Sequence, residues 1–362
     1  MHKHTFKIRL AAGALAAALL FTGCNTTDPS AKLVSINKGK DSISFGYGNF
    51  FTRFTQADYD QYYLAYYGNN YWREKLMDET KTTEESVKEE VMDEMKSLYQ
   101  SRVHASEFGV KLTDQDNKKI DKAVKAFLKD NEQETLKAMG ATEAYAKQML
   151  EEQTYEARLK QAMEEKRDKE LKDSEVNQTG FSYVQFLSGA TKDKDGKEIK
   201  YSNKELKAMA DKAASAKDFE AAVKETGFDL DSDNYTTSLS AKKAADESGL
   251  PEELFAQLKK LHEGERTGVI PSEEGKGYIV ARLDKTLDEE WTKAKRQNLQ
   301  EKYYNDTMEQ WNADTKWDVD EKLWAKVHFK EVFENPETGK TEASDEAAES
   351  DADETGEDSG QK

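Results

Sequence analysis

The side chains that could carry out chemistry are few in this chain of 362 residues. His104 and Glu107 stand one turn apart on a predicted helix and could touch a metal ion, although such a pair is more typical of a solvated helix face. The other histidines are far from it in sequence: His2, His4, His262 and His328. The chain contains no His-Glu-x-x-His, Gly-x-Ser-x-Gly or phosphate-binding glycine motif. We therefore expect neither a metal ion nor another cofactor.

Cys24, the only cysteine, follows a short basic and apolar leader. Residues 1–9 contain three basic side chains, and the apolar run of residues 10–21 is too short to span a bilayer as a mature helix. The sequence Phe21-Thr-Gly-Cys24 resembles a bacterial lipoprotein signal, although Leu20 stands one place earlier than the leucine of that pattern. The resemblance implies that Cys24 is lipidated and anchors the chain at the outer face of the cytoplasmic membrane. A simple signal peptide or a buried cysteine is the alternative.

The amino-acid composition limits the kinds of molecule that the chain is expected to bind. Charged residues make up 35% of the chain, and the formal net charge is −18. A polyanion such as nucleic acid is therefore an unfavourable partner. Only four prolines and abundant Ala, Glu, Lys and Gln indicate a helix-dominated protein.

A central segment, Phe181 to Asp284, begins and ends with strand-like runs at residues 181–187 and 277–283. Between them lie helical patterns at residues 203–216 and 218–226, a weak strand near Tyr235, a helix opening at Pro251, and a short run at residues 267–271. This order predicts a small α+β domain with its sheet on one side.

The same segment resembles the parvulin-type peptidyl-prolyl isomerases. The resemblance rests on the order and spacing of four short motifs: Asp218-Phe-Glu-Ala-Ala-Val-Lys-Glu225, Leu250-Pro-Glu-Glu-Leu-Phe255, Leu261-His-Glu-Gly-Glu265 and Gly277-Tyr278. It covers roughly 100 residues and implies a domain that binds a proline-containing peptide.

The residues that would catalyse isomerisation differ from the family pattern. The histidine of the first strand falls on Val184 or Gln185, and that of the last strand falls on Ile279. Asp229 fits the family's aspartate. The resemblance gives three catalytic candidates: Asp229, Gln185 and Tyr278. It also gives candidates for an apolar proline groove: Val184, Phe186, Leu254, Phe255 and Ile279. Because both histidines are replaced, we expect the isomerase activity to be weak or lost.

An aromatic-rich run precedes this segment, from Phe50 to Trp72. Several of its tyrosines fall at i, i+3, i+4, i+7 and i+8 and so share one face of a helix. As a functional interpretation they line an apolar surface for unfolded chains. Packing of the same helix on its neighbours is the alternative, and the two are compatible. The binding candidates are Tyr59, Tyr62, Tyr63 and Tyr66.

The segments on both sides of the central domain are helical and similar to the SurA and PrsA chaperones. Helices are predicted after residues 83–86, from Asp114 after Thr113, at residues 142–172, and at residues 287–311; residues 164–172 resemble a polar strut. Residues 317–329 are expected to end in a short strand. In the resembling chaperones the C-terminal segment packs on the N-terminal helices, which makes the parvulin-like domain an insertion.

The predicted organisation is a helical chaperone module with an inserted parvulin-like α+β domain. Its parts are a signal peptide at 1–23, a tether at 24–32, the N-terminal part of the module at 33–172, the parvulin-like domain at 173–285, the returning segment at 286–333 and a disordered acidic tail at 334–362. The resemblance implies an extracytoplasmic foldase that binds unfolded secreted polypeptides, with a homodimer possible. An active prolyl isomerase and a solute-binding or structural lipoprotein are the alternatives.

Overall fold

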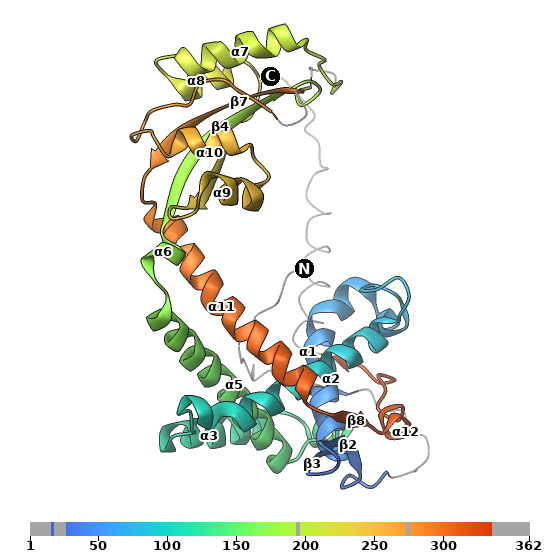
Figure 1. The fold of residues 1–362 in the computed structure, drawn as a ribbon. Coiled ribbons are helices and arrows are strands. Elements are labelled where there is room, and N and C mark those ends of the chain that lie inside the picture. The colour runs from blue at the N-terminus through green and yellow to red at the C-terminus, as the bar shows by residue number, and fades with distance from the viewer. Residues whose placement is uncertain (1–15, 18–26, 193–195, 273–275, 335–362) are drawn as a thin grey trace, which may run out of the picture. The chain divides into compact units, whose positions relative to one another are not determined.

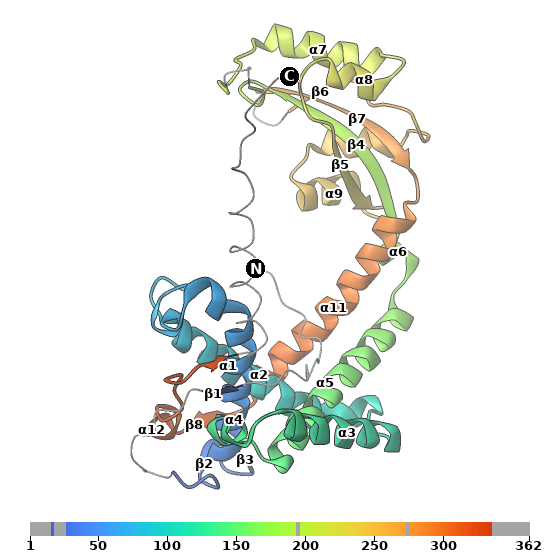
Figure 2. The ribbon, with the colours of Figure 1, turned by 180° about the vertical axis from the view of Figure 1, so that it is seen from behind.

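The computed structural model describes residues 16–17, 27–192, 196–272 and 276–334 (Figure 1). The chain divides into two compact units: unit 1 comprises residues 1–162 and 306–362, and unit 2 comprises residues 163–305. Helices dominate, and the small sheets are antiparallel, which places the chain in the predicted α+β class (Figures 1 and 2). The chain leaves unit 1 within helix α5 (Glu143–Glu170) and returns to it within helix α11 (Glu289–Asp314). The boundaries expected from the sequence, after residues 172 and 285, lie just outside these helices.

Unit 1 contains a three-stranded sheet built from both ends of the chain. Strands β2 (Lys32–Ile36) and β3 (Asp41–Ser44) form a hairpin, and Asn37, Lys38 and Gly39 take positive φ in its turn. Strand β8 (Trp317–Val319) pairs antiparallel with the other edge of β2. The sheet therefore joins segments that are almost the whole chain apart in sequence.

The helices of unit 1 begin at capping residues. Helix α1 (Phe45–Tyr67) is capped by Ser44, α2 (Thr83–His104) by Thr82, and α3 (Asp114–Asp130) by Thr113. The two threonines form capping boxes with acidic residues at the third helical position. Helix α2 thus includes residues 83–86, which were expected to precede it. A short helix, α4 (Gln133–Met139), was not predicted.

The segment after α11 differs from the expectation. Its strand β8 lies at the start of residues 317–329, and helix α12 (Glu321–Trp324) follows because Asp320 caps its first turn. The last strand, β9 (Phe333–Glu334), pairs with β1 (Ala16–Ala17). Phe329 and Phe333 are buried in the apolar core of unit 1 with residues of α1, α2 and α3.

Unit 2 contains a four-stranded antiparallel sheet of order β5-β4-β7-β6. The long central strands are β4 (Gln178–Leu187) and β7 (Gly277–Lys285), and the outer ones are β5 (Asp231–Thr236) and β6 (Ile270–Pro271). The helices of this unit are α6 (Asp173–Val176), α7 (Asn203–Ser215), α8 (Phe219–Lys224), α9 (Ala241–Ser248) and α10 (Glu252–Leu258). The strand-like runs predicted at residues 181–187 and 277–283 therefore lie side by side in one sheet, and the weak strand predicted near Tyr235 lies in β5 of the same sheet.

Helices cover both faces of this sheet, so the expectation of a sheet on one side was wrong. One face packs on α9 and α10, with Phe181, Leu254 and Ile279 among its buried residues. The other packs on α7 and α8, with Val184 and Leu206 among its buried residues. The central strands carry apolar residues on both faces, and such strands require two covering layers.

Residues 164–172, expected to form a polar strut, belong to unit 2, and α5 ends within them at Glu170. Met163 is fully buried, and Asp168 accepts hydrogen bonds from Arg296 and Gln300 of α11 at 3.0 and 2.8 Å.

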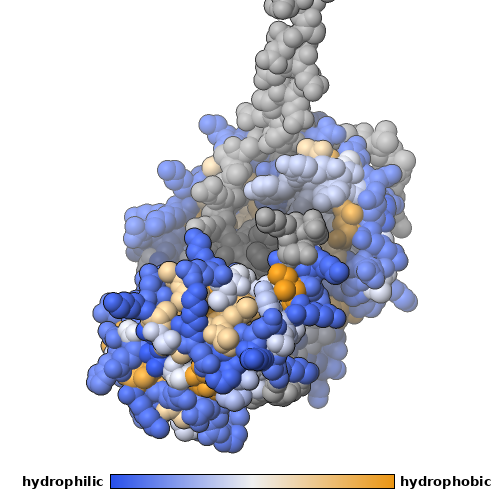
Figure 3. All heavy atoms as spheres, turned by 90° about the horizontal axis from the view of Figure 1, so that it is seen from above, coloured by the Kyte–Doolittle hydropathy of each residue, from blue (hydrophilic) through white to orange (hydrophobic). Residues whose placement is uncertain are grey.

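The surface shown in Figure 3 is mostly hydrophilic, with hydrophobic residues in small separate patches. In the described part of the chain, no helix combines the length and apolarity needed to cross a bilayer.

Candidate functional site

The catalytic candidates of unit 2 are not brought together. In the β4–β7 register, Gln185 lies opposite Ile279, and Phe186 lies opposite Tyr278. Side chains alternate between faces along a strand, so Gln185 faces the α9–α10 layer and Tyr278 faces the α7–α8 layer. Asp229 is exposed between α8 and β5. The sheet therefore separates two of the three candidates.

The candidates for the proline groove belong to the packed core. Leu254, Phe255 and Ile279 are buried on one face of the sheet, and Val184 and Phe186 are buried on the other. Phe255 packs edge-to-face on Phe181 with ring centres 5.9 Å apart, and Phe186 packs on Phe228 at 5.1 Å. These side chains fill the interior instead of lining one open groove, because β4 contributes residues to both faces.

A polar cluster that the sequence reasoning missed joins β4, β7 and α8. Ser182 donates a hydrogen bond to Asp284, and Arg282 pairs with Asp284 at 2.5 Å and with Glu220 at 3.1 Å. Because Asp284 is already engaged by a hydroxyl and a guanidinium group, it is poorly suited to act as a general base. The cluster is best explained as a tie between the sheet and α8.

The most distinctive surface of unit 1 is a row of tyrosines at the end of α1. We define the tyrosine row as Tyr62, Tyr63, Tyr66 and Tyr67, whose exposed fractions are 65%, 38%, 83% and 51%. Leu76 and Met77, in the connection to α2, are also exposed. Large apolar side chains this exposed on a folded unit are typical of a surface that contacts a partner.

The row continues into a packed aromatic base. Tyr63 stacks in a tilted geometry between Tyr59 and Tyr67, with ring centres 5.7 and 6.0 Å away. Tyr59 is half-buried, packs on Trp72 at 5.9 Å and donates a hydrogen bond to Glu90. Of the four predicted binding tyrosines, Tyr59 therefore belongs to the base and the other three to the exposed row.

A buried carboxylate fixes this base. Asp60 is 1% exposed and accepts hydrogen bonds from Tyr71 Oη and Trp72 Nε1, both at 2.8 Å, in the 3₁₀ helix η1 (Tyr71–Arg73). Its other oxygen accepts from Gln56 Nε2 at 3.1 Å and from the backbone N–H of Phe333 at 2.9 Å. Burial raises the pKa of Asp60 to about 6, against the opposing effects of the hydrogen bonds from Phe333, Tyr71 and Trp72 and of the nearby Arg53.

A buried arginine holds the same C-terminal segment. Arg53 donates to the carbonyl oxygen of His328 at 3.0 Å, pairs with Glu331 at 3.3 Å and lies 4.7 Å from the ring centre of Phe333. Arg53, Gln56 and Asp60 stand at i, i+3 and i+7 among buried aromatic residues. That spacing of polar residues within an apolar helix face was the available sequence signal, but their partners lie about 270 residues away in the chain.

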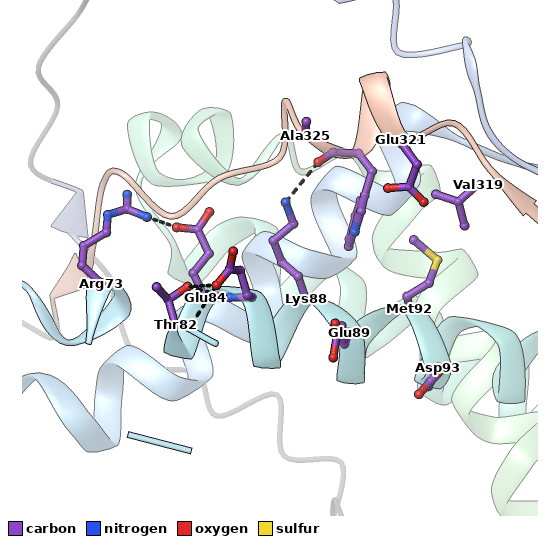
Figure 4. A pocket seen from close by; sticks show the side chains of 12 residues that line it. Arg73, Thr82, Glu84, Lys88, Glu89, Met92, Asp93, Val319, Glu321 and Ala325 are labelled. Carbon is purple, nitrogen blue, oxygen red and sulfur yellow. Dashed lines mark hydrogen bonds and ion pairs between the residues drawn. The ribbon is translucent and has the colours of Figure 1, made fainter. Parts of the chain in front are cut away.

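A groove of about 850 Å³ lies between α2 and the C-terminal segment (Figure 4). Lys88 reaches across it, donates to the carbonyl oxygens of Trp324 and Val327 at 3.1 and 2.7 Å, and lies 4.8 Å from the Trp324 ring centre. Arg73 pairs with Glu84 at its end. The full lining is Arg73, Thr82, Glu84, Glu85, Lys88, Glu89, Met92, Asp93, Val319, Glu321, Trp324 and Ala325. Lys88 joins α2 to the C-terminal segment, and Arg73 joins η1 to α2, so the contacts in this groove favour a structural role for it.

Further buried acids lie between the helices of unit 1. Tyr47 donates to Glu152 at 2.5 Å, and Arg102 lies 3.8 Å from the same carboxylate, so the three side chains join α1, α5 and α2. Burial, with repulsion from Glu156, raises the pKa of Glu94 to about 7. No sequence pattern marked these acids, because carboxylates are abundant throughout the chain.

Among the described residues, the histidines His104, His262 and His328 are far apart in sequence and are not grouped with a second potential catalytic side chain beyond the glutamates beside His104 and His262. His104 Nδ1 lies 2.7 Å from Glu107, and its ring stacks on Trp311 at 4.0 Å. His262 is exposed and lies beside Glu265. Within residues 16–17, 27–192, 196–272 and 276–334, no three His, Cys, Asp or Glu side chains are grouped so as to hold a metal ion. Cys24, the predicted lipidation site, lies outside the described residues.

Comparison with known proteins gives structural likeness only. No family model matches the chain, and no match was found among curated proteins. The foldase protein PrsA of Streptococcus pneumoniae aligns with 66% of this chain and 92% of its own, at 14% identity and a TM-score of 0.26. A peptidylprolyl isomerase (PrsA) of Bacillus cereus aligns with 67% and 86%, at 15% and 0.27. A SurA-like chaperone structure from Campylobacter jejuni aligns with 80% and 98%, at 11% and 0.20.

These solved structures come from the same group of foldases and chaperones that the sequence resembles. Their identities and TM-scores are too low to carry a functional argument. The chain is thus similar to PrsA-like and SurA-like structures.

Proposed function

We propose that this protein is an extracytoplasmic, membrane-anchored chaperone that binds unfolded secreted polypeptides, with a prolyl isomerase site that is weak or lost. The observation that carries the proposal is the tyrosine row of α1. Four exposed aromatic rings on a rigid, internally braced base offer contact area to many sequences without a specific pocket. A chaperone with many clients needs that kind of surface.

The aromatic base beneath the tyrosine row favours binding because it limits the conformational entropy that the side chains lose when a client binds. Tyr63 is already stacked on its neighbours, and Trp72 is locked by Asp60. A client that packs on these rings immobilises few additional rotamers. Tyrosine also keeps its hydroxyl group in water while its ring contacts an apolar segment, so the row can stay exposed without a client.

The proposal of a weak or lost isomerase site rests on unit 2. The parvulin resemblance implies one histidine at Val184 or Gln185 and another at Ile279, and of these residues Gln185 and Ile279 are partners in the β4–β7 register. Neither side chain titrates, and Ile279 is buried in the core. The chain thus lacks the paired polar groups that would stabilise a twisted amide at that point.

The experiment measures how well the mature chain suppresses aggregation of reduced α-lactalbumin, an acidic client that a protein of net charge −18 does not attract electrostatically. The test variant is Tyr62→Ser/Tyr66→Ser. The matched control, Leu287→Ser/Trp291→Ser, removes exposed apolar area from unit 2 instead. We expect the test variant to need at least fivefold more protein for half-suppression, and the control to match the wild type.

Equal suppression by both variants would exclude the tyrosine row as the binding surface. A wild-type chain that leaves aggregation unchanged would exclude the chaperone function and favour a solute-binding or structural role. Cis–trans isomerisation of a proline tetrapeptide, measured in parallel, tests the second half of the proposal. Acceleration comparable to that by an active parvulin would show that the site is intact and the proposal of its loss wrong.

The membrane anchor is tested separately. Cells that express the wild-type chain and Cys24→Ala are extracted with a detergent that separates into two phases. We expect the wild-type protein in the detergent phase and the variant in the aqueous phase, because the anchor is the acyl chains on Cys24. Recovery of the wild-type protein in the aqueous phase would contradict lipidation.

A further inference from the structure

Two members of the tyrosine row, Tyr62 and Tyr66, present ring faces that no other ring and no cation contacts in the described part of the chain. The other two members stack on each other with ring centres 6.0 Å apart. Elsewhere in unit 1 the fold uses such a face itself, since the Arg102 guanidinium group lies 5.4 Å from the ring centre of Tyr99. The face of an aromatic ring attracts a cation because it carries partial negative charge. Tyr62 and Tyr66 therefore offer two ring faces on which a cation from a partner can lie.

Two carboxylates beside the row, Asp58 and Glu90, form no ion pair with any residue that the structure describes. Asp58 stands one turn before Tyr62 on α1 and is half-buried, and burial raises its pKa. Glu90 is exposed on α2 and accepts a hydrogen bond from the Tyr59 hydroxyl group at 3.0 Å. Both carboxylates interact electrostatically with that hydroxyl group, so they lie close together at the base of the row.

The cations closest in sequence to the row are directed elsewhere. Arg73 pairs with Glu84 (Figure 4), and Lys81 pairs with Glu89 at 2.5 Å. Lys75 interacts electrostatically with the first turn of α2. Residues 58–90 contain nine acidic and four basic residues, a formal charge of −5. The surroundings of the row are therefore negative, and its two carboxylates need a counter-charge from outside.

The spacing on α1 lets one cation use both features. Residues four apart on a helix have Cβ atoms about 5–6 Å apart. An arginine side chain of a client can therefore lie on the ring of Tyr62 and reach the carboxylate of Asp58. The planar guanidinium group stacks on an aromatic ring and pairs with a carboxylate better than an ammonium group does.

We propose that the tyrosine row prefers client segments in which an arginine or a lysine stands beside apolar residues. The cation lies on the exposed face of Tyr62 or Tyr66, and Asp58 and Glu90 supply the counter-charge. Apolar contact with the rings is sufficient for binding, and the basic residue adds affinity. This inference rests on the proposed chaperone function and defines the class of segment that the row selects.

The experiment measures the binding of three labelled peptides to the mature chain by fluorescence anisotropy. The peptides share the same leucine and phenylalanine residues, contain no proline, and differ at two positions that are Arg, Gln or Glu. We expect the Arg peptide to bind at least fivefold more tightly than the Gln peptide, and the Glu peptide to bind most weakly. The ratio of the Arg and Gln affinities should fall to half or less in 0.5 M NaCl, because salt screens exposed charges.

A pair of variants separates the two carboxylates from the general acidity of the chain. The test variant is Asp58→Asn/Glu90→Gln. The matched control, Glu132→Gln/Glu134→Gln, makes the same change in net charge at exposed residues at the start of α4. We expect the Arg and Gln peptides to bind the test variant within twofold of each other, and the control to keep the fivefold preference. A preference that survives in the test variant, or that falls equally in both variants, would overturn the inference.

Failure of the inference is distinguishable from failure of the proposed function. If the Arg and Gln peptides bind the wild-type chain equally, and Tyr62→Ser/Tyr66→Ser weakens both, the row binds clients without the proposed preference and the inference is wrong. If no peptide binds, the chaperone function is wrong as well. A wild-type dimer that excludes the peptides and that the tyrosine substitutions dissociate would show that a second copy occupies the row, which also overturns the inference.

Discussion

Replacement of Asp60 by Asn tests whether the buried network of α1 is held by a carboxylate whose ionisation opposes folding. The folded-state pKa of about 6 lies above the ordinary value of 3.8, because burial outweighs three hydrogen-bond donors and the charge of Arg53. A raised pKa means that the folded state binds the proton more tightly than the unfolded state. The resulting stabilisation is fully present below about pH 3.8 and is lost as the pH rises through about 6.

The size of the effect follows from the two pKa values. Their difference corresponds to about 3 kcal/mol over the full titration. Between pH 5 and pH 7.5 the wild-type chain should lose about 1.4 kcal/mol of unfolding free energy through this group. The amide introduced by Asp60→Asn does not titrate. Its NH₂ group would point at hydrogen-bond donors and destabilise the folded state, and this destabilisation is independent of pH. The stability advantage of wild type over Asp60→Asn should therefore be larger at pH 5 than at pH 7.5 by about 1.4 kcal/mol.

Urea unfolding followed by tryptophan fluorescence measures this difference, since four of the five tryptophans lie in unit 1. Asp93→Asn, an exposed position on α2, is the matched control and should show the same pH dependence as wild type. An advantage that stays constant within about 0.4 kcal/mol from pH 5 to pH 7.5 would refute the reasoning. It would mean that the hydrogen-bond donors and Arg53 outweigh burial and keep Asp60 ionised.

Three further outcomes follow from the packing. Gly277→Ala should lower the unfolding free energy of unit 2 by about 2 kcal/mol or more in thermal denaturation, because its Cβ would lie 2.1 Å from the carbonyl oxygen of Phe186, whereas Gly268→Ala, with its nearest neighbour at 3.7 Å, should change little. Asp116→Asn should be less stable than wild type near pH 6, and the difference should vanish as the pH falls from about 4 to about 2. The capping-box hydrogen bonds lower the pKa of this carboxyl to about 2, and a variant as stable as wild type at pH 6 would contradict this. Lys88→Met should cost about 1–3 kcal/mol in urea unfolding, since its ammonium group donates to two carbonyl oxygens of the C-terminal segment, and no loss would show that these bonds are not formed in solution.

Local sequence patterns were sufficient for the elements with clear periodicity or caps. Thr113 marks the start of α3, and the strand-like runs at residues 181–187 and 277–283 lie within β4 and β7 of one sheet. Helix α4 was missed because seven residues are too few to establish a helical period. Helix α12 was missed because its capping residue, Asp320, lies within residues 317–329, for which the sequence predicted a short strand.

The candidate sites of unit 2 were less predictable for a physical reason. Strands β4 and β7 are apolar on both faces, so period-2 alternation does not show which side chains point to which layer. The sequence consequently left the choice between Val184 and Gln185 open, and it combined residues that the sheet separates. Likewise, no local pattern connects Asp60 to Phe333, because that contact depends on how the whole chain folds.

The pairing of β8 with β2 and the packing of Phe333 on α1 determine when unit 1 can be completed. Synthesis delivers the N-terminus first, whereas unit 2 is continuous in sequence and has all its described strands once residue 285 has been made. Unit 1 cannot be completed until β8 and Phe333 have been synthesised. A product interrupted before residue 317 would lack β8 and would leave the side of α1 that packs on Phe329 and Phe333 exposed to proteases.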